Sequence, residues 1–595
     1  MSKIFEFMKP YAGMLLCIVA LLSVEATCAL VLPGYMADIV NDGVLPGHIP
    51  TILRNGIIML LITLLSMAVA LAAGFFTART ATGVANDLRE AVFHKVIHFS
   101  NAEINRFAAS SLITRTTNDI MQVQNTMMMA IRQFIYAPII GVGGVIRALD
   151  RNVSMAWIVA LATAVMLGLC AILFIIALPK FKAWQKLIDR LNLVTRENLS
   201  GILVVRAFST QKFEKKRFAQ ANKELAGTEL FVNKTFAFMT PIIALVMNIT
   251  TALIVWVGAH YVSAFRIDIG DIFAFLQYGM LVIFAFLMIA IMFIMVPRAV
   301  VCAERIKEVL ETKSSIRYRK DPQPLPEDFK GIIEFRNVSF RYPDTTAGDG
   351  NVLNNISFTA KPGKTTAIVG STGCGKTTLL SLLLRFYDVN SGAIYVDGMD
   401  IRDIRKEELH GKIGYVPQKA SLFSGTIRSN LLYAVTAAER TLVSEGSPSA
   451  RSATDEKILE AVEIAQAEAF IQKKPGGYES NVAQGGSNFS GGQKQRLSIA
   501  RALVKNAPIY LFDDSFSALD LKTDALLRSA LKKKMGGKTK LIVAQRITTI
   551  MDADQIVVLD NGKISGLGTH SELMKTCEVY KEIAASQLNE EEAAL

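Results

Sequence analysis

Six stretches in the first three hundred residues are long and apolar enough to cross a lipid bilayer, and they constrain the fold more than any other feature. About 20 consecutive apolar residues are needed for a helix to cross the hydrocarbon core. Four of the stretches have no charged residue, and the first has only Glu25. The weakest stretch has a short uncharged core, bracketed by Arg132 and Arg147. The predicted spans are residues 11–32, 57–76, 127–147, 155–178, 236–259 and 272–296.

Basic residues between the spans predict the orientation of the chain. Residues 77–126 contain five Lys or Arg and residues 179–235 contain twelve, whereas residues 33–50 contain none. Basic loops stay in the cytoplasm, so both chain ends are predicted to be cytoplasmic. The weak span at 127–147 is needed, because without it the two basic loops would lie on opposite sides. The first apolar run lacks a small-residue cleavage site and is interpreted as an anchor.

The two basic loops are too long to be simple turns. They contain about 50 and 57 residues, with helical patterning rather than Gly/Pro punctuation. Structureless loops of that length are unusual. We therefore expect the membrane helices to continue into the cytoplasm and to return there. These basic loops also account for the net charge of +12, so the charge does not indicate a nucleic-acid-binding protein.

A phosphate-binding loop stands at the start of a second, soluble half. Residues 365–369 read as a buried strand, and the sequence GSTGCGKT follows at 370–377. This is a complete G-x-x-x-x-G-K-T motif between a strand and a helix. Its glycines let backbone N–H groups surround phosphates, and the helix N-terminus favours negative charge. Lys376 is predicted to reach the β- and γ-phosphates, and Thr377 the magnesium ion.

A second apolar strand ends in acids. The sequence PIYLFDD at 508–514 has the form of a Walker B strand, whose aspartate holds magnesium. Asp513 is the predicted magnesium ligand, and Asp514 follows it.

At this point the chain closely resembles the ABC exporter family, over essentially its whole length. The feature that carries the resemblance is FSGGQ at 489–493, which is similar to that family's LSGGQ signature with Phe in first place. The resemblance implies that Tyr342 stacks on adenine, that Gln418 contacts magnesium, and that SALD at 517–520 is the D-loop. Residues 111–120 and 200–208 resemble the regions through which exporters couple their two halves.

The predicted site residues fall into three groups. Those predicted to act in catalysis are Lys376, Gln418, Asp514 and Gln545. Those predicted to contact magnesium are Thr377, Gln418 and Asp513. Those predicted to bind ATP are Tyr342, Gly370, Ser371, Thr372, Gly373, Cys374, Gly375, Lys376, Thr377, Thr378, Ser490, Gly491, Gly492, Gln493 and Asp520.

Two departures from the family pattern affect catalysis. The family usually has Glu as general base after the Walker B aspartate, whereas this chain has Asp514, one methylene shorter. The family's switch histidine is replaced by Gln545, which cannot carry a histidine's charge. Gln484 is a smaller departure, where exporters often have Glu. Ordinary variation that leaves hydrolysis intact remains an alternative.

The resemblance implies what these departures mean for assembly. In ABC proteins each ATP is clamped between one subunit's Walker motifs and the other subunit's signature. This chain would then bring weak catalytic residues to one site and an intact signature to the other. A second half-transporter with Glu and His in place would restore one efficient site. The chain is therefore expected to be the degenerate subunit of a heterodimeric bacterial multidrug exporter.

The predicted organisation combines an all-α six-helix membrane domain with an α/β P-loop domain. The boundaries are a membrane domain at 1–310, a linker at 311–330, a nucleotide-binding domain at 331–575 and a tail at 576–595. Residues 434–454 are rich in Ser, Ala, Gly and Pro and are predicted to be a surface insertion. The expected location is the bacterial cytoplasmic membrane, with the nucleotide-binding domain inside.

The cargo is not encoded in any motif. The last span is rich in Phe and Met, which suit a promiscuous apolar pocket but equally suit lipid-facing or interhelical packing. Glu25 and Arg132 are functional candidates because charges at membrane depth are costly, although they could also pair with each other. Drugs, lipids, peptides and siderophores remain open as cargo. A regulatory ATP-binding subunit without a pumping role is a further alternative, disfavoured by the intact signature.

Overall fold

The computed structural model describes residues 2–319, 321–343, 345, 350–435 and 448–587, and these form two compact units. The helical unit comprises Met1–Ile97 and Ala109–Thr312. The sheet unit comprises His98–Ala108 and Lys313–Leu595. The predicted boundary near residue 310 therefore misses one segment, because residues 98–108 pack with the sheet unit. The predicted fold class, helices followed by an α/β domain, is confirmed.

Long helices make up the helical unit. Within the described chain, five helices are long and apolar enough to cross a membrane, and α7 contributes a shorter apolar stretch, Val153–Leu169. The helices are α1 (Ser2–Met8), α2 (Ala12–Ile39), α3 (Ile49–Ile97), α5 (Ala109–Thr114), α6 (Ile120–Arg151), α7 (Val153–Ser200), α8 (Ile202–Ala207), α9 (Gln211–Ser263) and α10 (Ile269–Glu311).

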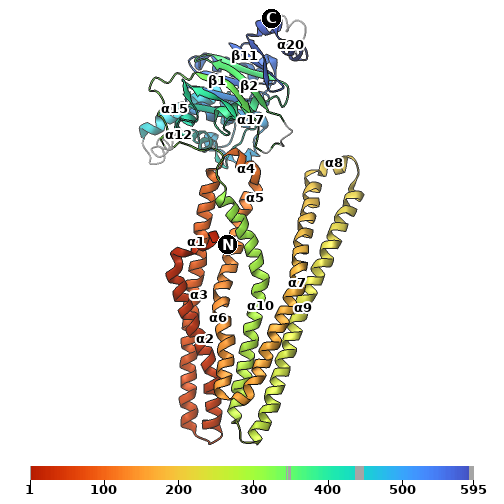
Figure 1. Ribbon diagram of the computed structural model, residues 1–595. Helices are drawn as coiled ribbons and strands as arrows, with labels where there is room; N and C mark the ends of the chain where they lie inside the picture. Colours follow the sequence, from red (N-terminus) through yellow and green to blue (C-terminus); the bar gives the residue numbers. More distant parts are fainter. Residues whose placement is uncertain (1, 320, 344, 346–349, 436–447, 588–595) are drawn as a thin grey trace. The chain divides into compact units, whose positions relative to one another are not determined.

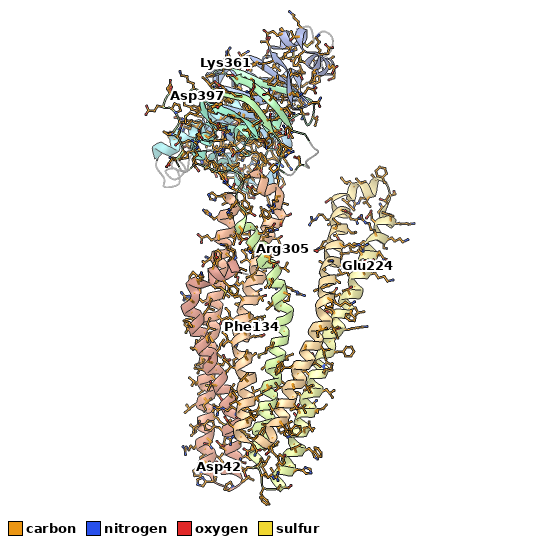
Figure 2. All side chains as sticks on the ribbon, viewed as in Figure 1. Asp42, Phe134, Glu224, Arg305, Lys361 and Asp397 are labelled. Atoms are coloured by element: carbon orange, nitrogen blue, oxygen red, sulfur yellow. The ribbon has the colours of Figure 1, made fainter. Side chains whose placement is uncertain are left out.

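Helices α7 and α9 run side by side as an antiparallel pair, joined by the short helix α8 (Figure 1). Both continue beyond their apolar runs into the basic segment between them. Ion pairs link the polar stretches of the two helices: Arg190 of α7 lies 2.5 Å from Glu224 of α9, which Figure 2 labels, and Arg217 lies 2.6 Å from Glu197. The charges that prevent these stretches from entering lipid therefore hold the two helices together.

Close packing joins α2, α6 and α10 in the helical unit. A Cβ added at Gly144 of α6 would lie 2.7 Å from a methyl group of Val282 on α10, so only glycine permits this approach. Near one end of the same helices, Arg151 donates to the Gly34 carbonyl at 2.8 Å and to Asp38 at 2.7 Å. Its other guanidinium nitrogen lies 3.6 Å from Asp271 of α10. One arginine thus links all three helices.

The sheet unit contains a six-stranded and a four-stranded sheet. The larger sheet has the order β12-β11-β3-β10-β9-β6, parallel except for β12, and the smaller antiparallel sheet has the order β2-β1-β4-β5. A short pair, β7 with β8, completes the strands. The strands are β1 (Ile333–Phe340), β2 (Leu353–Ala360), β3 (Thr365–Gly370), β4 (Ser391–Val396), β5 (Met399–Asp400), β6 (Ile413–Val416), β7 (Gly425–Thr426), β8 (Asn481–Val482), β9 (Ile509–Asp513), β10 (Thr539–Val543), β11 (Gln555–Asp560) and β12 (Lys563–Gly568).

Helices cover the larger sheet, whose central strands are apolar on both faces, as parallel strands usually are. The helices of the sheet unit are α4 (Asn101–Phe107), α11 (Lys376–Leu383), α12 (Lys406–Gly411), α13 (Ile427–Leu432), α15 (Pro448–Ile464), α16 (Glu468–Gln472), α17 (Gly491–Val504), α18 (Leu521–Lys534), α19 (His570–Thr576) and α20 (Glu578–Ala585). Most of the predicted 434–454 insertion, residues 436–447, lies outside the described residues. The last part of the predicted insertion is helical, because α15 already begins at Pro448. Of the predicted tail at 576–595, residues 588–595 also lie outside the described residues, whereas α20 packs into the core of the sheet unit through Tyr580 and Ala584.

Helix α4 belongs to the sheet unit through specific contacts. Ser100 caps the helix together with Glu103, in a reciprocal capping box. Glu103 also accepts a hydrogen bond from the backbone N–H of Ser315 at 3.0 Å, and Ala102 joins the core of the sheet unit. The hydrogen bonds from Ser100 and Ser315 hold the pKa of the Glu103 carboxyl below its usual range, although burial opposes them. The segment predicted as a cytoplasmic loop is therefore a docked helix.

Asp397, labelled in Figure 2, holds the backbone segment that immediately precedes β1. Its carboxylate accepts hydrogen bonds from the backbone N–H groups of Lys330, Gly331 and Ile332 at 2.6, 2.9 and 2.7 Å. Its backbone lies in the left-handed region, with φ of 47°, which Asp and Asn tolerate better than Ala.

Replacing Asp397 with Ala is expected to destabilise the sheet unit by about 2–3 kcal/mol, because three backbone donors lose a charged acceptor. Thermal unfolding of the full-length protein would show this as a lower midpoint. Asp397→Asn is the matched control: it keeps one acceptor oxygen and tolerates the same backbone conformation, so it should lose less. Equal midpoints for the wild type and the Ala variant would contradict this role.

Candidate functional site

The carboxyl ends of four neighbouring parallel strands bring the predicted site residues to one edge of the larger sheet. Strand β3 leads into the phosphate-binding loop, and β9 ends at Asp513, which Asp514 follows. Strand β10 precedes Gln545, and β6 precedes Gln418. Strands β3, β10, β9 and β6 are consecutive in the sheet. Ligands of open α/β sheets bind outside the carboxyl ends of the strands. Residues separated by up to about 175 positions in the chain thus converge through the sheet order.

The loop between β3 and α11 has the backbone conformation that phosphate binding needs. Gly375 has φ of 102°, and a Cβ there would lie 2.6 Å from Leu353. The Lys376 ammonium donates to the carbonyls of Gly370 and Ser371, both at 2.7 Å, so the lysine lies over its own loop. Ser371, Thr372, Gly373 and Cys374 form the rest of the loop. Helix α11 begins at Lys376, which directs its free N–H groups and positive dipole end toward an anion.

Asp513 and Thr377 form the predicted magnesium position. The Thr377 hydroxyl donates to Asp513 at 2.9 Å. Asp513 is 1% exposed, and burial, with the neighbouring charge of Asp514, raises the pKa of its carboxyl. A buried carboxylate whose described hydrogen-bond partner is a neutral hydroxyl fits a divalent cation. Within the described residues, no group of three or more His, Cys, Asp or Glu could hold a metal ion alone.

Asp514 lies between two side-chain amides. Gln545 donates to one of its carboxylate oxygens at 3.0 Å, and Gln418 approaches the same oxygen at 3.5 Å. The backbone of Asp514 is left-handed, with φ of 47°, and its N–H bonds to the Val543 carbonyl at 2.9 Å. The structure therefore brings all three predicted residues together. Neither amide can take up or release a proton at neutral pH, so the carboxylate is the only base in this group.

The signature and the D-loop are local structures on other elements. Ser490 caps α17: its hydroxyl accepts from the Gln493 N–H at 3.3 Å, and the Gln493 side chain accepts from the Ser490 N–H at 3.1 Å. Gly491 is the first residue of that helix. A Cβ at Gly492 would lie 3.2 Å from the Ala518 carbonyl, so the D-loop packs against the signature. Asp520 caps α18 by accepting from the Thr523 N–H at 2.9 Å.

Tyr342 connects the predicted adenine position to two residues that sequence reasoning missed. Its hydroxyl lies 2.9 Å from that of Thr378 on α11. Its ring meets the ring of Tyr387 edge-to-face at 5.2 Å, and the Tyr387 hydroxyl accepts a hydrogen bond from Asn105 of α4 at 3.1 Å. A continuous path of contacts therefore leads from the phosphate-binding helix to α4. No sequence motif marks Tyr387 or Asn105.

In the helical unit, the two charged residues predicted at membrane depth pair with each other. The Arg132 guanidinium of α6 lies 2.9 Å from the Glu25 carboxylate of α2. Glu25 is buried, while the arginine side chain is half exposed. Of the alternatives left open by the sequence, the structure therefore has the ion pair.

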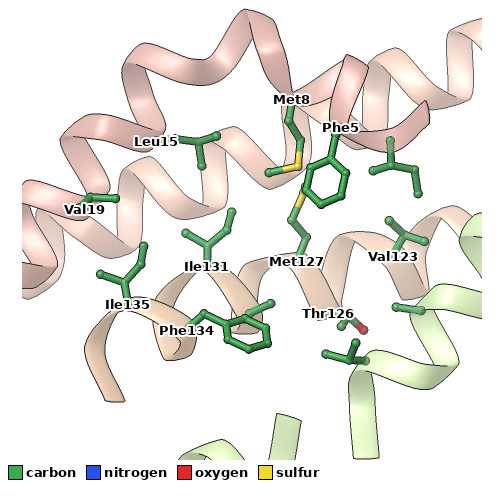
Figure 3. Close-up of a pocket in the computed structure, with 14 residues that line it drawn as sticks. Phe5, Met8, Leu15, Val19, Val123, Thr126, Met127, Ile131, Phe134 and Ile135 are labelled. Carbon is green, nitrogen blue, oxygen red and sulfur yellow. The ribbon is translucent and has the colours of Figure 1, made fainter. Parts of the chain in front are cut away.

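An apolar cavity of about 300 Å³ lies between α1, α2, α6 and α10 (Figure 3). Figure 3 shows Phe5 and Met8 of α1 above Met127 of α6, with Phe134 on the opposite side. Its lining is apolar apart from Thr126. The lining residues are Ile4, Phe5, Met8, Leu15, Val19, Val123, Thr126, Met127, Ala130, Ile131, Phe134, Ile135, Val296 and Ala299.

Among the side chains that the structure describes, no Phe or Met of the last span lines this cavity. Phe275 is fully buried among helices, whereas Phe273 and Phe284 are 44% and 48% exposed. Phe286 and Met288 pack against buried clusters. These residues therefore pack between helices or lie exposed on the helix surface, and they do not line a common pocket.

Comparison with known proteins agrees with both units. Residues 14–286 match the ABC transporter transmembrane region family, and residues 353–517 match the ABC transporter family. An uncharacterised ABC transporter ATP-binding protein of Mycobacterium tuberculosis is 40% identical over 98% of this chain and 97% of its own length. The ATP-dependent lipid A-core flippase of Pseudomonas aeruginosa is 31% identical, over 100% of this chain and 97% of its own.

A solved structure has the same fold throughout. A bacterial Atm1-family ABC exporter with ATP bound superposes with a TM-score of 0.77 over 98% of this chain and 99% of its own, at 24% sequence identity. The helical unit, the phosphate-binding loop, the Walker B strand and the signature thus occur together in the order found in half-transporters. The chain belongs to the ABC transporter family, as a membrane domain fused to an ATP-binding domain of the exporter type.

Proposed function

We propose that this chain is the degenerate-site half of a heterodimeric exporter that uses ATP to move apolar or amphipathic molecules across the bacterial cytoplasmic membrane. The observation that carries the proposal is the position of Asp514 between the amides of Gln545 and Gln418. The carboxylate is one methylene shorter than the family's glutamate, and Gln545 stands where the family has its switch histidine. Phosphoryl transfer depends on positioning, and a displacement of about 1 Å costs about a hundredfold in rate.

The proposed roles of the chain's residues combine the resemblance to ABC exporters with the positions described above. Lys376 and the loop N–H groups would bind the β- and γ-phosphates, while Thr377, Asp513 and Gln418 would hold magnesium. Magnesium, when bound, neutralises charge on the phosphates. Asp514 would orient the attacking water poorly, so that hydrolysis is slow. Gln545 would donate a hydrogen bond to the γ-phosphate. Tyr342 stacks on adenine, and Ser490, Gly491, Gly492, Gln493 and Asp520 complete the partner subunit's site.

The intact capping box at Ser490 supports the proposal that this chain pairs with a partner whose ATP site is efficient. It presents the N-terminus of α17, an anion-binding feature, although this chain's own carboxylate is poorly suited to hydrolysis. A partner half-transporter with Glu after its Walker B aspartate and with a switch His would use that signature. ATP binding then closes the nucleotide domains, and hydrolysis releases them, which biases the membrane domains between inward- and outward-facing states.

Turnover in lipid nanodiscs tests this proposal. The purified chain alone should hydrolyse ATP at least tenfold more slowly than the same chain co-purified with a half-transporter that has Glu and His in place. Typical enzymes turn over about 1–1000 times per second. Turnover in that range by the chain alone would contradict the degenerate-site proposal and indicate a working homodimer.

Lipid is the second candidate cargo, and the apolar cavity favours it together with the flippase among the relatives. Ala130→Phe should fill the cavity from α6 and lower transport of a fluorescent phospholipid or an amphipathic dye at least tenfold, which corresponds to about 1.4 kcal/mol of binding. The measurement is uptake into proteoliposomes. Met129→Phe is the matched control, because Met129 is 45% exposed on the same helix and does not line the cavity. Equal transport by both variants would show that the cavity is not part of the cargo path.

A further inference from the structure

The last described helix ends beside the switch segment, residues 545–547. Helix α20 is firmly anchored, because Tyr580 and Ala584 are fully buried and the Tyr580 hydroxyl lies 2.7 Å from His570. Ala584 belongs to the same apolar core as Ile547. Gln587 follows two residues after the helix, so its backbone is held near the switch segment.

The Gln587 side chain makes two hydrogen bonds to the backbone of that segment. Its amide oxygen accepts from the Ile547 N–H at 2.9 Å. Its amide nitrogen donates to the Gln545 carbonyl at 2.9 Å. The donor and the acceptor on the backbone distinguish the two ends of the amide, so only one orientation satisfies both bonds. A single side chain thus clamps the backbone on both sides of Arg546.

The clamped backbone carries the residue that faces the catalytic carboxylate. Gln545 donates to Asp514 at 3.0 Å, and Arg546 donates to the Ser517 carbonyl of the D-loop at 3.3 Å. A shift of the backbone at Gln545 therefore changes the distance between its amide and both Asp514 and a bound γ-phosphate. The rate of hydrolysis is sensitive to displacements of about 1 Å.

We propose that Gln587 is a positioning residue for the ATP site, through which the C-terminal end of the chain sets the geometry of the switch segment. The inference rests on the proposed function only in that Gln545 acts on ATP. Gln587 does not touch the nucleotide, so its effect is on turnover rather than on binding. Because Gln587 is exposed, water can replace part of what it contributes, and the expected effect is moderate.

Three variants of the full-length chain in nanodiscs separate the two bonds. Gln587→Ala removes both, Gln587→Asn shortens the side chain by one methylene so that it cannot span both groups, and Gln587→Glu keeps the acceptor but loses the donor. Glu582→Ala, exposed on the same helix, is the control. The readouts are hydrogen–deuterium exchange of peptides covering residues 545–550, and kcat and KM from release of radiolabelled phosphate.

The proposal expects a specific combination of results. In the Ala and Asn variants the switch-segment amides exchange at least tenfold faster and kcat falls about five- to tenfold, while KM for ATP changes less than twofold. The Glu variant is intermediate, and the control matches the wild type. Unchanged exchange, or faster exchange with unchanged kcat, would overturn it. Failure of the Ala variant to fold leaves the Asn and Glu variants to decide.

These outcomes are distinct from those that test the heterodimer. Brisk turnover by the wild-type chain alone would contradict the degenerate-site proposal, yet the effect of Gln587 would remain measurable, and with greater signal. Exchange of the 545–550 peptides does not depend on turnover at all.

Discussion

Replacing Ser490 with Asp should lower the ATPase activity of the complex between this chain and its partner at least a hundredfold. Asp caps a helix as well as Ser does, so the first turn of α17 stays intact. The added carboxylate, however, would face the γ-phosphate in the partner subunit's site and repel it. Loss of one oriented donor toward a transition-state charge already costs about 100- to 1000-fold. Steady-state phosphate release by the purified complex would measure the effect.

Two controls make the Ser490 result specific. Ser490→Thr keeps a hydroxyl and a helix cap and should retain most of the activity. Thermal unfolding should have the same midpoint in both variants, because both preserve the capping box. A loss of less than about threefold in Ser490→Asp would mean that the partner's site does not depend on this signature, and the asymmetric arrangement would be wrong.

The double substitution Asp514→Glu with Gln545→His should raise the turnover of the purified chain about a hundredfold. The longer carboxylate recovers about 1 Å of reach toward the attacking water. The imidazole can also carry a positive charge near the γ-phosphate, which an amide cannot. The same exchange removes the 3.0 Å hydrogen bond with which Gln545 now holds Asp514. Phosphate release from the chain alone in nanodiscs is the measurement.

The control for this gain is Asp514→Gln with Gln545→His. It has the length of glutamate but no charge, so it should give no increase if the carboxylate acts as a base. Equal turnover by the Glu and Gln forms would indicate that size rather than basicity matters. A wild-type chain that already matches the double variant would show that Asp514 and Gln545 are working catalytic residues.

Features confined to consecutive residues could be predicted from the sequence. The apolar spans depend on length and local composition, and the phosphate-binding loop depends on eight adjacent residues between a strand and a helix. The predicted departures at Asp514 and Gln545 could be proposed from the sequence because each residue stands next to a recognisable motif. The fold class followed from the same local features and is confirmed.

The division into units was predictable only in outline. Residues 98–108 contain one Arg and one Glu, and nothing in this local sequence indicates that α4 packs with the sheet unit. Its place depends on Glu103 bonding to Ser315 and on Asn105 bonding to Tyr387, residues more than two hundred positions away. The apolar cavity also could not be predicted from local sequence, because side chains from four different helices line it.

The sequence by itself determined that the chain has membrane-spanning segments and a phosphate-binding loop, because each of these features resides in a short run of adjacent residues. Only the tertiary structure decided which side chains surround Asp514, that Glu25 pairs with Arg132, and that Gln587 clamps the switch segment. Those contacts join residues far apart in the chain. They arise from strand order and side-chain packing, which leave no periodic or local signal in a single sequence.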